Sequence, residues 1–188
     1  TGTALNGTAR CSSCSVGQSG SGAGGKCALC AKGTYRSGAM TDAVAFPDYI
    51  LKCKPCEKGK YQNQEGQALC LPCVPGQYQD QEGNKSCIKC ASGRQFNATI
   101  GGSSASNCVA CVEGQYQPEE ESTFCLPCLT GTFQNASGSS SCNDCPIGFN
   151  NGDTKKISCS ECKAGKFQDV IQQANCEGMF YVFVKGWI

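Results

Sequence analysis

The 188-residue sequence contains no histidine, one Trp and two Met. Because histidine is the commonest general base, and no nucleophile or carboxylate pair stands out, the sequence argues against an enzyme and predicts no cofactor. No run of about twenty apolar residues is present, so a membrane span is not predicted. The first ten residues lack the charged-then-apolar pattern of a signal peptide, so a secreted protein would be represented here by a processed form or an excerpt.

The chain also lacks a marked net charge. Its 16 Lys and Arg against 15 Asp and Glu leave a formal charge of +1, and the charged residues are interspersed rather than gathered into a basic stripe. Binding to nucleic acid or to an anionic membrane therefore has no electrostatic support.

Cysteine and glycine are abundant, with 19 and 24 copies. Large aliphatic residues are sparse and scattered outside the last few residues, so a single large core is not expected. A cysteine content of about a tenth is typical of disulfide scaffolds, in which covalent links replace the apolar surface that small units cannot bury.

The cysteines form a repeat. CxxC pairs recur with a basic period of 17 residues, which predicts a linear array of small units that contact mainly their neighbours. The pairs begin at Cys11, Cys27, Cys53, Cys70, Cys87, Cys108, Cys125, Cys142 and Cys159, and a lone Cys176 follows. We therefore expect an N-terminal segment 1–10, about nine repeats over 11–176 with insertions at 36–52 and 97–107, and an apolar segment 177–188.

The repeat extends beyond cysteine. A Gly follows each pair by three residues, an aromatic residue usually comes two later, and Gln is next at Gln62, Gln79, Gln117, Gln134 and Gln168. A second Gly stands four residues before the next Cys at Gly66, Gly83 and Gly138, which indicates a turn between two short strands. The aromatic is the main large apolar side chain of most units, so we expect the repeat core at Tyr35, Tyr61, Tyr78, Tyr116, Phe133 and Phe167.

These patterns predict a small disulfide-rich fold: an elongated linear array of short β-hairpin-like repeats, with little helix and no single large core. A CxxC pair can also be a redox dithiol or half of a zinc site. Nine tandem copies without a βαβ pattern do not resemble a redox enzyme. Four-cysteine zinc sites would consume the pairs two at a time, whereas every spacer here carries the same pattern, so we expect no metal.

The disulfide interpretation makes a parity prediction. If the second Cys of each pair bonds the first Cys of the next, eighteen cysteines are used, Cys176 ends the series and Cys11 remains for a partner upstream. The predicted bridges are Cys14–Cys27, Cys30–Cys53, Cys56–Cys70, Cys73–Cys87, Cys90–Cys108, Cys111–Cys125, Cys128–Cys142, Cys145–Cys159 and Cys162–Cys176. Pairing within each CxxC, or a nested scheme, stays open. The series is favoured because closing a loop of about 15 residues contributes about 3 kcal/mol in the chain-entropy model.

Four Asn-x-Ser/Thr sequons predict N-linked glycans at Asn6, Asn84, Asn97 and Asn135. Three of them fall in the variable arms of the repeats, where a loop should be exposed. Together with the cysteines they predict passage through an oxidising secretory route to the cell surface or the extracellular space.

Two segments depart from the repeat. The last residues, "FYVFVKGWI", read as a strand that either caps the last repeat or adds to an edge on another molecule. The insertion at 36–52 carries apolar residues and is a candidate for lateral or ligand contacts.

From Cys11 to Cys176, the unit CxxCxxGx[Tyr/Phe]Gln resembles the ephrin-receptor-like cysteine-rich repeat and the first loop of tumour-necrosis-factor-receptor modules. The resemblance implies elongated extracellular arrays with the loop bridge described above. We therefore expect a structural extracellular glycoprotein that self-associates into a filament, fibril or coat. The alternative is a receptor or adhesion ectodomain that binds a protein ligand.

Overall fold

The computed structural model describes residues 14–21, 26–38 and 52–178. The chain divides into two compact units, one formed by Thr1–Cys90 with Phe96–Cys108 and the other by Ala91–Gln95 with Val109–Ile188. Cys11, Asn6, most of the insertion at 36–52 and the apolar C-terminal segment lie outside the described residues, so the predictions for them stay predictions.

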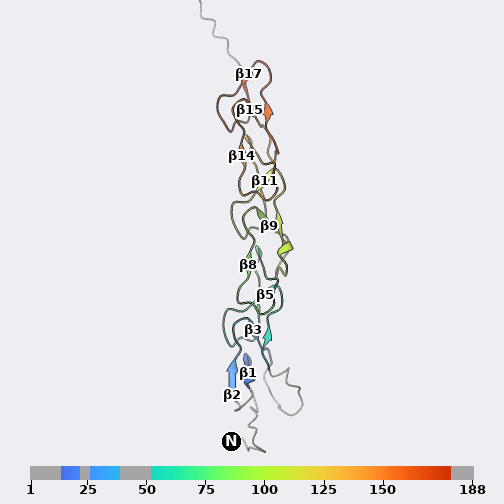
Figure 1. Cartoon of the computed structure of the whole chain (residues 1–188), viewed down its shortest axis with the longest axis vertical. Helices are drawn as coiled ribbons and strands as arrows, with labels where there is room; N and C mark the ends of the chain where they lie inside the picture. The colour runs from blue at the N-terminus through green and yellow to red at the C-terminus, as the bar shows by residue number, and fades with distance from the viewer. Residues whose placement is uncertain (1–13, 22–25, 39–51, 179–188) are drawn as a thin grey trace, which may run out of the picture. The chain divides into compact units, whose positions relative to one another are not determined.

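Within each unit, two-stranded hairpins follow one another in chain order (Figure 1). The first hairpin has four-residue strands, and the others have strands of two or three residues. The pairs are β1 (Gln18–Ser21) with β2 (Lys26–Leu29), β3 (Thr34–Tyr35) with β4 (Lys54–Pro55), β5 (Lys60–Tyr61) with β6 (Leu71–Pro72), β7 (Gln77–Tyr78) with β8 (Ile88–Lys89), β9 (Arg94–Phe96) with β10 (Cys108–Ala110), β11 (Gln115–Tyr116) with β12 (Leu126–Pro127), β13 (Thr132–Phe133) with β14 (Asn143–Asp144), β15 (Phe149–Asn150) with β16 (Ser160–Glu161), and β17 (Lys166–Phe167) with β18 (Glu177–Gly178).

Helix is confined, among the described residues, to the 3-10 turn η2 (Ala105–Asn107) in the second insertion. The predicted fold class of short disulfide-linked hairpins without a large core is confirmed.

Each hairpin is closed by one disulfide, and we number the repeats 1–9 by these bridges. The bridges are Cys14–Cys27, Cys30–Cys53, Cys56–Cys70, Cys73–Cys87, Cys90–Cys108, Cys111–Cys125, Cys128–Cys142, Cys145–Cys159 and Cys162–Cys176. These are the nine pairs of the parity prediction. In repeats 1–8 the first cysteine of the bridge is at most 1% exposed, so the buried interior of each repeat is centred on its disulfide.

Adjacent repeats are joined by backbone hydrogen bonds that recur along each unit. At five of the eight junctions, the amide of the Gly after the CxxC and the amide of the residue three positions later both donate to carbonyls of the next repeat. In return, a turn amide of that next repeat donates to the carbonyl of the buried Cys. Between repeats 7 and 8 these bonds run from Gly131 N to Asn151 O (2.7 Å), from Gln134 N to Lys156 O (3.1 Å) and from Lys155 N to Cys128 O (2.9 Å). Because the bonds use main-chain atoms, they are largely independent of the side chains in the loops.

A closer contact links six of the nine repeats to the second repeat after each of them. The repeat Gly has a positive φ, and in these six repeats a Cβ at that position would overlap the backbone carbonyl of the turn two repeats further on. These contacts pair Gly17 with Gly66, Gly33 with Gly83, Gly59 with Gly101, Gly93 with Gly138, Gly114 with Lys155, and Gly131 with Gln172. The Gly is thus required for its φ and also for the close approach of another backbone.

The turn residue has a left-handed conformation also in repeats 6, 8 and 9, where it is not glycine. Glu121, Lys155 and Gln172 have φ of 60–61°, and each stands four residues before the next Cys, the position that Gly138 holds in repeat 7. Since this conformation costs a non-Gly residue about 1 kcal/mol or more, the surrounding hydrogen bonds and the disulfide must impose it.

Comparison of Gly131→Ala with Gly165→Ala separates the two requirements on the repeat Gly. Both residues have a φ near 80°, but a Cβ at Gly165 has no atom within 4 Å, whereas one at Gly131 overlaps the Gln172 carbonyl. We expect Gly165→Ala to cost about 1 kcal/mol from strain, and Gly131→Ala to cost about 1–3 kcal/mol more. Denaturant unfolding with the disulfides intact measures both, and equal losses would contradict the close-approach account.

Candidate functional site

The six repeated aromatics are not the most buried side chains of their repeats. Tyr35, Tyr61, Tyr78, Tyr116, Phe133 and Phe167 are half-buried, and Tyr78 packs on a small cluster of Cys90, Phe96 and Cys108. The expectation that these aromatics form the repeat core therefore needs correction: the buried position is the next residue. Its occupants are Arg36, Gln62, Gln79, Phe96, Gln117, Gln134, Asn151 and Gln168, each between 3% and 6% exposed.

Glutamine can be buried there because the loop satisfies its amide group. In repeat 4, the Gln79 Oε1 accepts a hydrogen bond from the Gln81 amide (3.0 Å), and its Nε2 donates to the Ser86 carbonyl (2.7 Å). The side chain thus ties the start of the loop to the residue before the closing Cys87. Repeats 3, 6, 7 and 9 make the same two bonds through Gln62, Gln117, Gln134 and Gln168.

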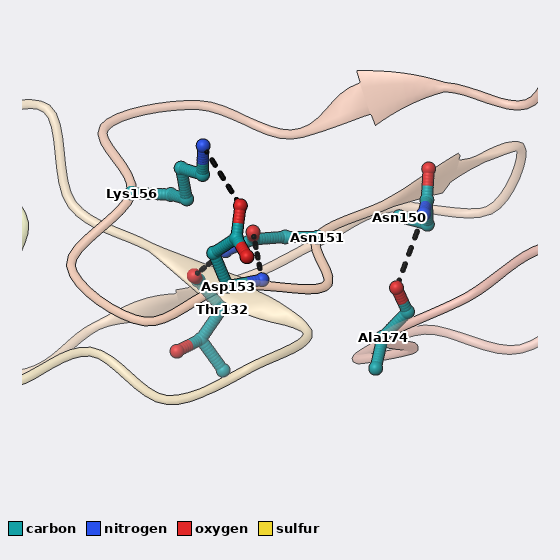
Figure 2. Close-up of polar contacts among 6 residues, drawn as sticks. All are labelled: Thr132, Asn150, Asn151, Asp153, Lys156 and Ala174. Carbon is teal, nitrogen blue, oxygen red and sulfur yellow. Dashed lines mark hydrogen bonds and ion pairs between the residues drawn. The ribbon is translucent and has the colours of Figure 1, made fainter.

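Repeats without this glutamine satisfy the position in other ways. Arg36 Nη1 donates to the Gln18 carbonyl in the preceding repeat. Figure 2 shows that Asn151, with its shorter side chain, accepts from the Asp153 amide (3.1 Å) but donates from Nδ2 to the Thr132 carbonyl of repeat 7 (2.7 Å). The shorter asparagine side chain thus links two repeats, whereas glutamine at this position stabilises a single loop.

The same view shows two further polar links in repeats 8 and 9. Asn150 Nδ2 donates to the Ala174 carbonyl of repeat 9 (3.1 Å), and Lys156 forms an exposed ion pair with Asp153 (3.0 Å) within the repeat 8 loop (Figure 2). An exposed pair of this kind contributes little to stability, so the amide contacts to the backbone are the more important links.

Sequence reasoning recorded the recurrence of glutamine but assigned it no role. The available signal was the fixed position after the aromatic in five repeats, combined with the capacity of a primary amide to donate and accept at once.

The eighteen bridged cysteines offer no thiolate for redox chemistry or zinc binding, because both require a free, deprotonated sulfur. Among the described residues, no group of three His, Cys, Asp or Glu side chains is placed to hold a metal ion. No helix in the described part of the chain is long and apolar enough to cross a membrane.

Three sequons lie within the described residues. Asn97 and Asn135 are exposed. Asn84 is half-buried, and its Nδ2 is 3.4 Å from the Gln81 carbonyl in the same turn. Asn97 and Asn135 are therefore the sequons at which the folded repeat leaves most room for a sugar.

The insertion at 97–107 is well organised. Ser104 caps η2 through its side chain, and the Asn107 side chain accepts from the Ser104 amide (3.1 Å), which together form a capping box. The Asn107 carbonyl accepts from the Asn97 amide (2.7 Å) and closes the loop. Ile100 is 66% exposed, so the insertion presents an apolar side chain on a defined loop.

Comparison with known families agrees with this repeat geometry. Residues 65–108, 98–132 and 120–158 match the family model described as tyrosine-protein kinase ephrin type A/B receptor-like. The three matches overlap and together span half of the chain. A search of curated proteins finds no match.

Gln79→Ala tests the buried amide, with Gln81→Ala as a control in the same turn. Gln79 is 3% exposed and joins two backbone groups, whereas the Gln81 side chain is exposed and only its backbone takes part. We expect Gln79→Ala to cost about 1–3 kcal/mol, because an amide and a carbonyl lose their partner, and Gln81→Ala to stay within about 0.5 kcal/mol. Denaturant unfolding measures both. A Gln79→Ala variant as stable as the control would contradict the assigned role.

Proposed function

Since the chain belongs to the ephrin-receptor-like repeat family, we propose that it is a structural extracellular glycoprotein that self-associates to form or decorate a filament, fibril or cell-surface coat. Nine disulfides in a family of cysteine-rich repeats indicate an extracellular or secreted module. The further step to self-association is a proposal that rests on how the repeats are joined.

The observation that carries the proposal is the main-chain linkage of the repeats. Each repeat is closed by a disulfide, and the same three backbone hydrogen bonds join successive repeats at five of the eight junctions although the loop residues differ. Most of the buried interior consists of cystine and amide groups, while large side chains such as Leu69 and Leu129 are 65% and 64% exposed. A constant scaffold of backbone hydrogen bonds and disulfides, with exposed side chains that can make lateral contacts, suits a load-bearing protein.

The proposed role is non-enzymatic and needs no cofactor. The buried polar position of each repeat is occupied by an amide or a guanidinium whose hydrogen bonds go to the backbone. These groups stabilise the loops, so their contacts favour a structural role.

A ligand-binding ectodomain is the second candidate, favoured by the match to a receptor-like family. The insertion at 97–107 is its best-supported contact surface, because a capped loop presents the exposed Ile100. The insertion at 36–52, also a candidate, lies largely outside the described residues.

Negative-stain microscopy of the purified, oxidised chain distinguishes the two candidates. We expect regular polymers at high protein concentration, because the exposed apolar side chains and the repeated surface allow many equivalent contacts. Sedimentation that shows only monomer at the highest attainable concentration would contradict the structural proposal and favour the ligand-binding one.

Expression in a eukaryotic secretory host tests the glycan prediction. We expect enzymatic deglycosylation to lower the intact mass, and Asn97→Gln and Asn135→Gln each to remove one glycan, because both side chains are exposed. Neither substitution should change the free energy of unfolding of the unglycosylated chain by more than about 0.5 kcal/mol. An intact mass that already equals the polypeptide mass would contradict the prediction.

A further inference from the structure

The near-neutral net charge conceals an uneven distribution along the chain. Residues 26–62 contain seven Lys or Arg and three Asp or Glu, whereas residues 95–154 contain six Asp or Glu and no Lys or Arg. The charges of opposite sign are thus concentrated in different repeats.

The basic residues of repeats 2 and 3 gather around one disulfide. We call Lys32, Lys52, Lys54 and Lys58 the basic cluster. Lys52 and Lys54 flank Cys53. The bridge partner of Cys53 is Cys30, and their Cα atoms are 5.5 Å apart. Lys32 is two residues after Cys30. Lys54 lies in β4, and Lys52 is two residues before it.

Backbone pairing brings Lys58 to the same region. The Cys56 amide donates to the Gly33 carbonyl (2.8 Å), which joins the residue next to Lys32 to the segment that carries Lys58. All four lysines are exposed, and none forms an ion pair with another described residue. Glu57, which is adjacent to Lys58, pairs with Lys60 (3.0 Å).

Repeats 6 and 7 present the opposite charge. We call Glu113, Glu119, Glu120 and Asp144 the acidic segment. All four are exposed, and none is paired with another described residue. Glu113 follows the buried Cys of its repeat by two residues, the position that Lys32 and Lys58 hold in repeats 2 and 3. Homologous positions in the same scaffold therefore carry opposite charges.

We propose that the basic cluster of one copy binds the acidic segment of a second copy, so that repeats 2–3 lie against repeats 6–7 of a neighbouring molecule. This inference rests on the self-association of the proposed function and identifies the surfaces that direct it. A polyanionic polysaccharide would also fit the basic cluster, but it would give no role to the acidic segment, which a second copy explains.

Exposed ion pairs contribute little each and are screened by salt. Their effect is to select the partner surface and its register, with apolar side chains such as Leu71 and Leu129, which are 47% and 64% exposed, supplying further contact. Association should therefore weaken as the salt concentration rises.

A charge-exchange experiment tests the inference. Variant A carries Lys32→Glu, Lys54→Glu and Lys58→Glu, and variant B carries Glu113→Lys, Glu119→Lys and Glu120→Lys. The substituted side chains are exposed, so each variant should fold with its disulfides intact, which peptide mapping checks. By sedimentation at low salt, we expect each variant alone to associate about tenfold or more weakly than the parent, and an equimolar mixture of A and B to associate as the parent does.

The outcomes separate this inference from the proposed function. If the parent associates but neither the reversals nor salt alters it, the charged surfaces are excluded while self-association stands. If the parent stays monomeric, self-association itself is excluded. If the parent stays monomeric but binds heparin, used as the sulfated-polysaccharide probe, and variant A does not, the basic cluster serves a polysaccharide and the inference is overturned.

Discussion

The disulfide between the buried second Cys of one CxxC pair and the first Cys of the next is the constraint on which the structure depends. Strands of two residues and half-buried aromatics offer too little apolar contact to hold a hairpin alone. Closing a loop of this length contributes about 3 kcal/mol by restricting the unfolded chain. The bridge also buries cystine where a larger domain would place aliphatic residues, and that burial leaves the loop exteriors free to vary.

Once the loops are closed, main-chain contacts propagate from repeat to repeat. The hydrogen bonds from Gly131 and Gln134 hold the next repeat, and the approach of the Gln172 carbonyl to Gly131 involves the repeat after that. A repeat therefore depends on two successors within its unit, which makes its stability a property of the local array. The buried glutamine connects the structure within a repeat to the contacts between repeats. Its side chain closes its own loop, and its backbone amide donates to the next repeat.

Much of this was accessible from the sequence because cysteine spacing reports loop closure directly. Cys176 is not part of a CxxC pair, so bridges between successive pairs use it and leave only Cys11 unbridged. The Gly of CxxCxxG indicates a position with positive φ. The importance of Gln79 was missed because hydrophobicity favours Tyr78 as the core, whereas a loop rich in unpaired backbone groups preferentially buries an amide. The contact between alternate repeats was also missed, since the turn position is glycine in repeat 7 but Lys155 or Gln172 in repeats 8 and 9. Because the contact is made by a backbone carbonyl, the turn position does not require one residue type and shows no pattern in the sequence.

The most direct test of the account is non-reducing tryptic mapping of the denatured, alkylated chain around Cys87 and Cys90, because Lys89 lies between them. Cleavage after Lys60, Lys85, Lys89 and Arg94 yields peptides 61–85, 86–89 and 90–94. The account predicts that 86–89, which contains Cys87, is linked to 61–85 through Cys73, while 90–94 is linked to the peptide that contains Cys108. A disulfide between 86–89 and 90–94 would show that this CxxC pair closes on itself, and would contradict the architecture described above.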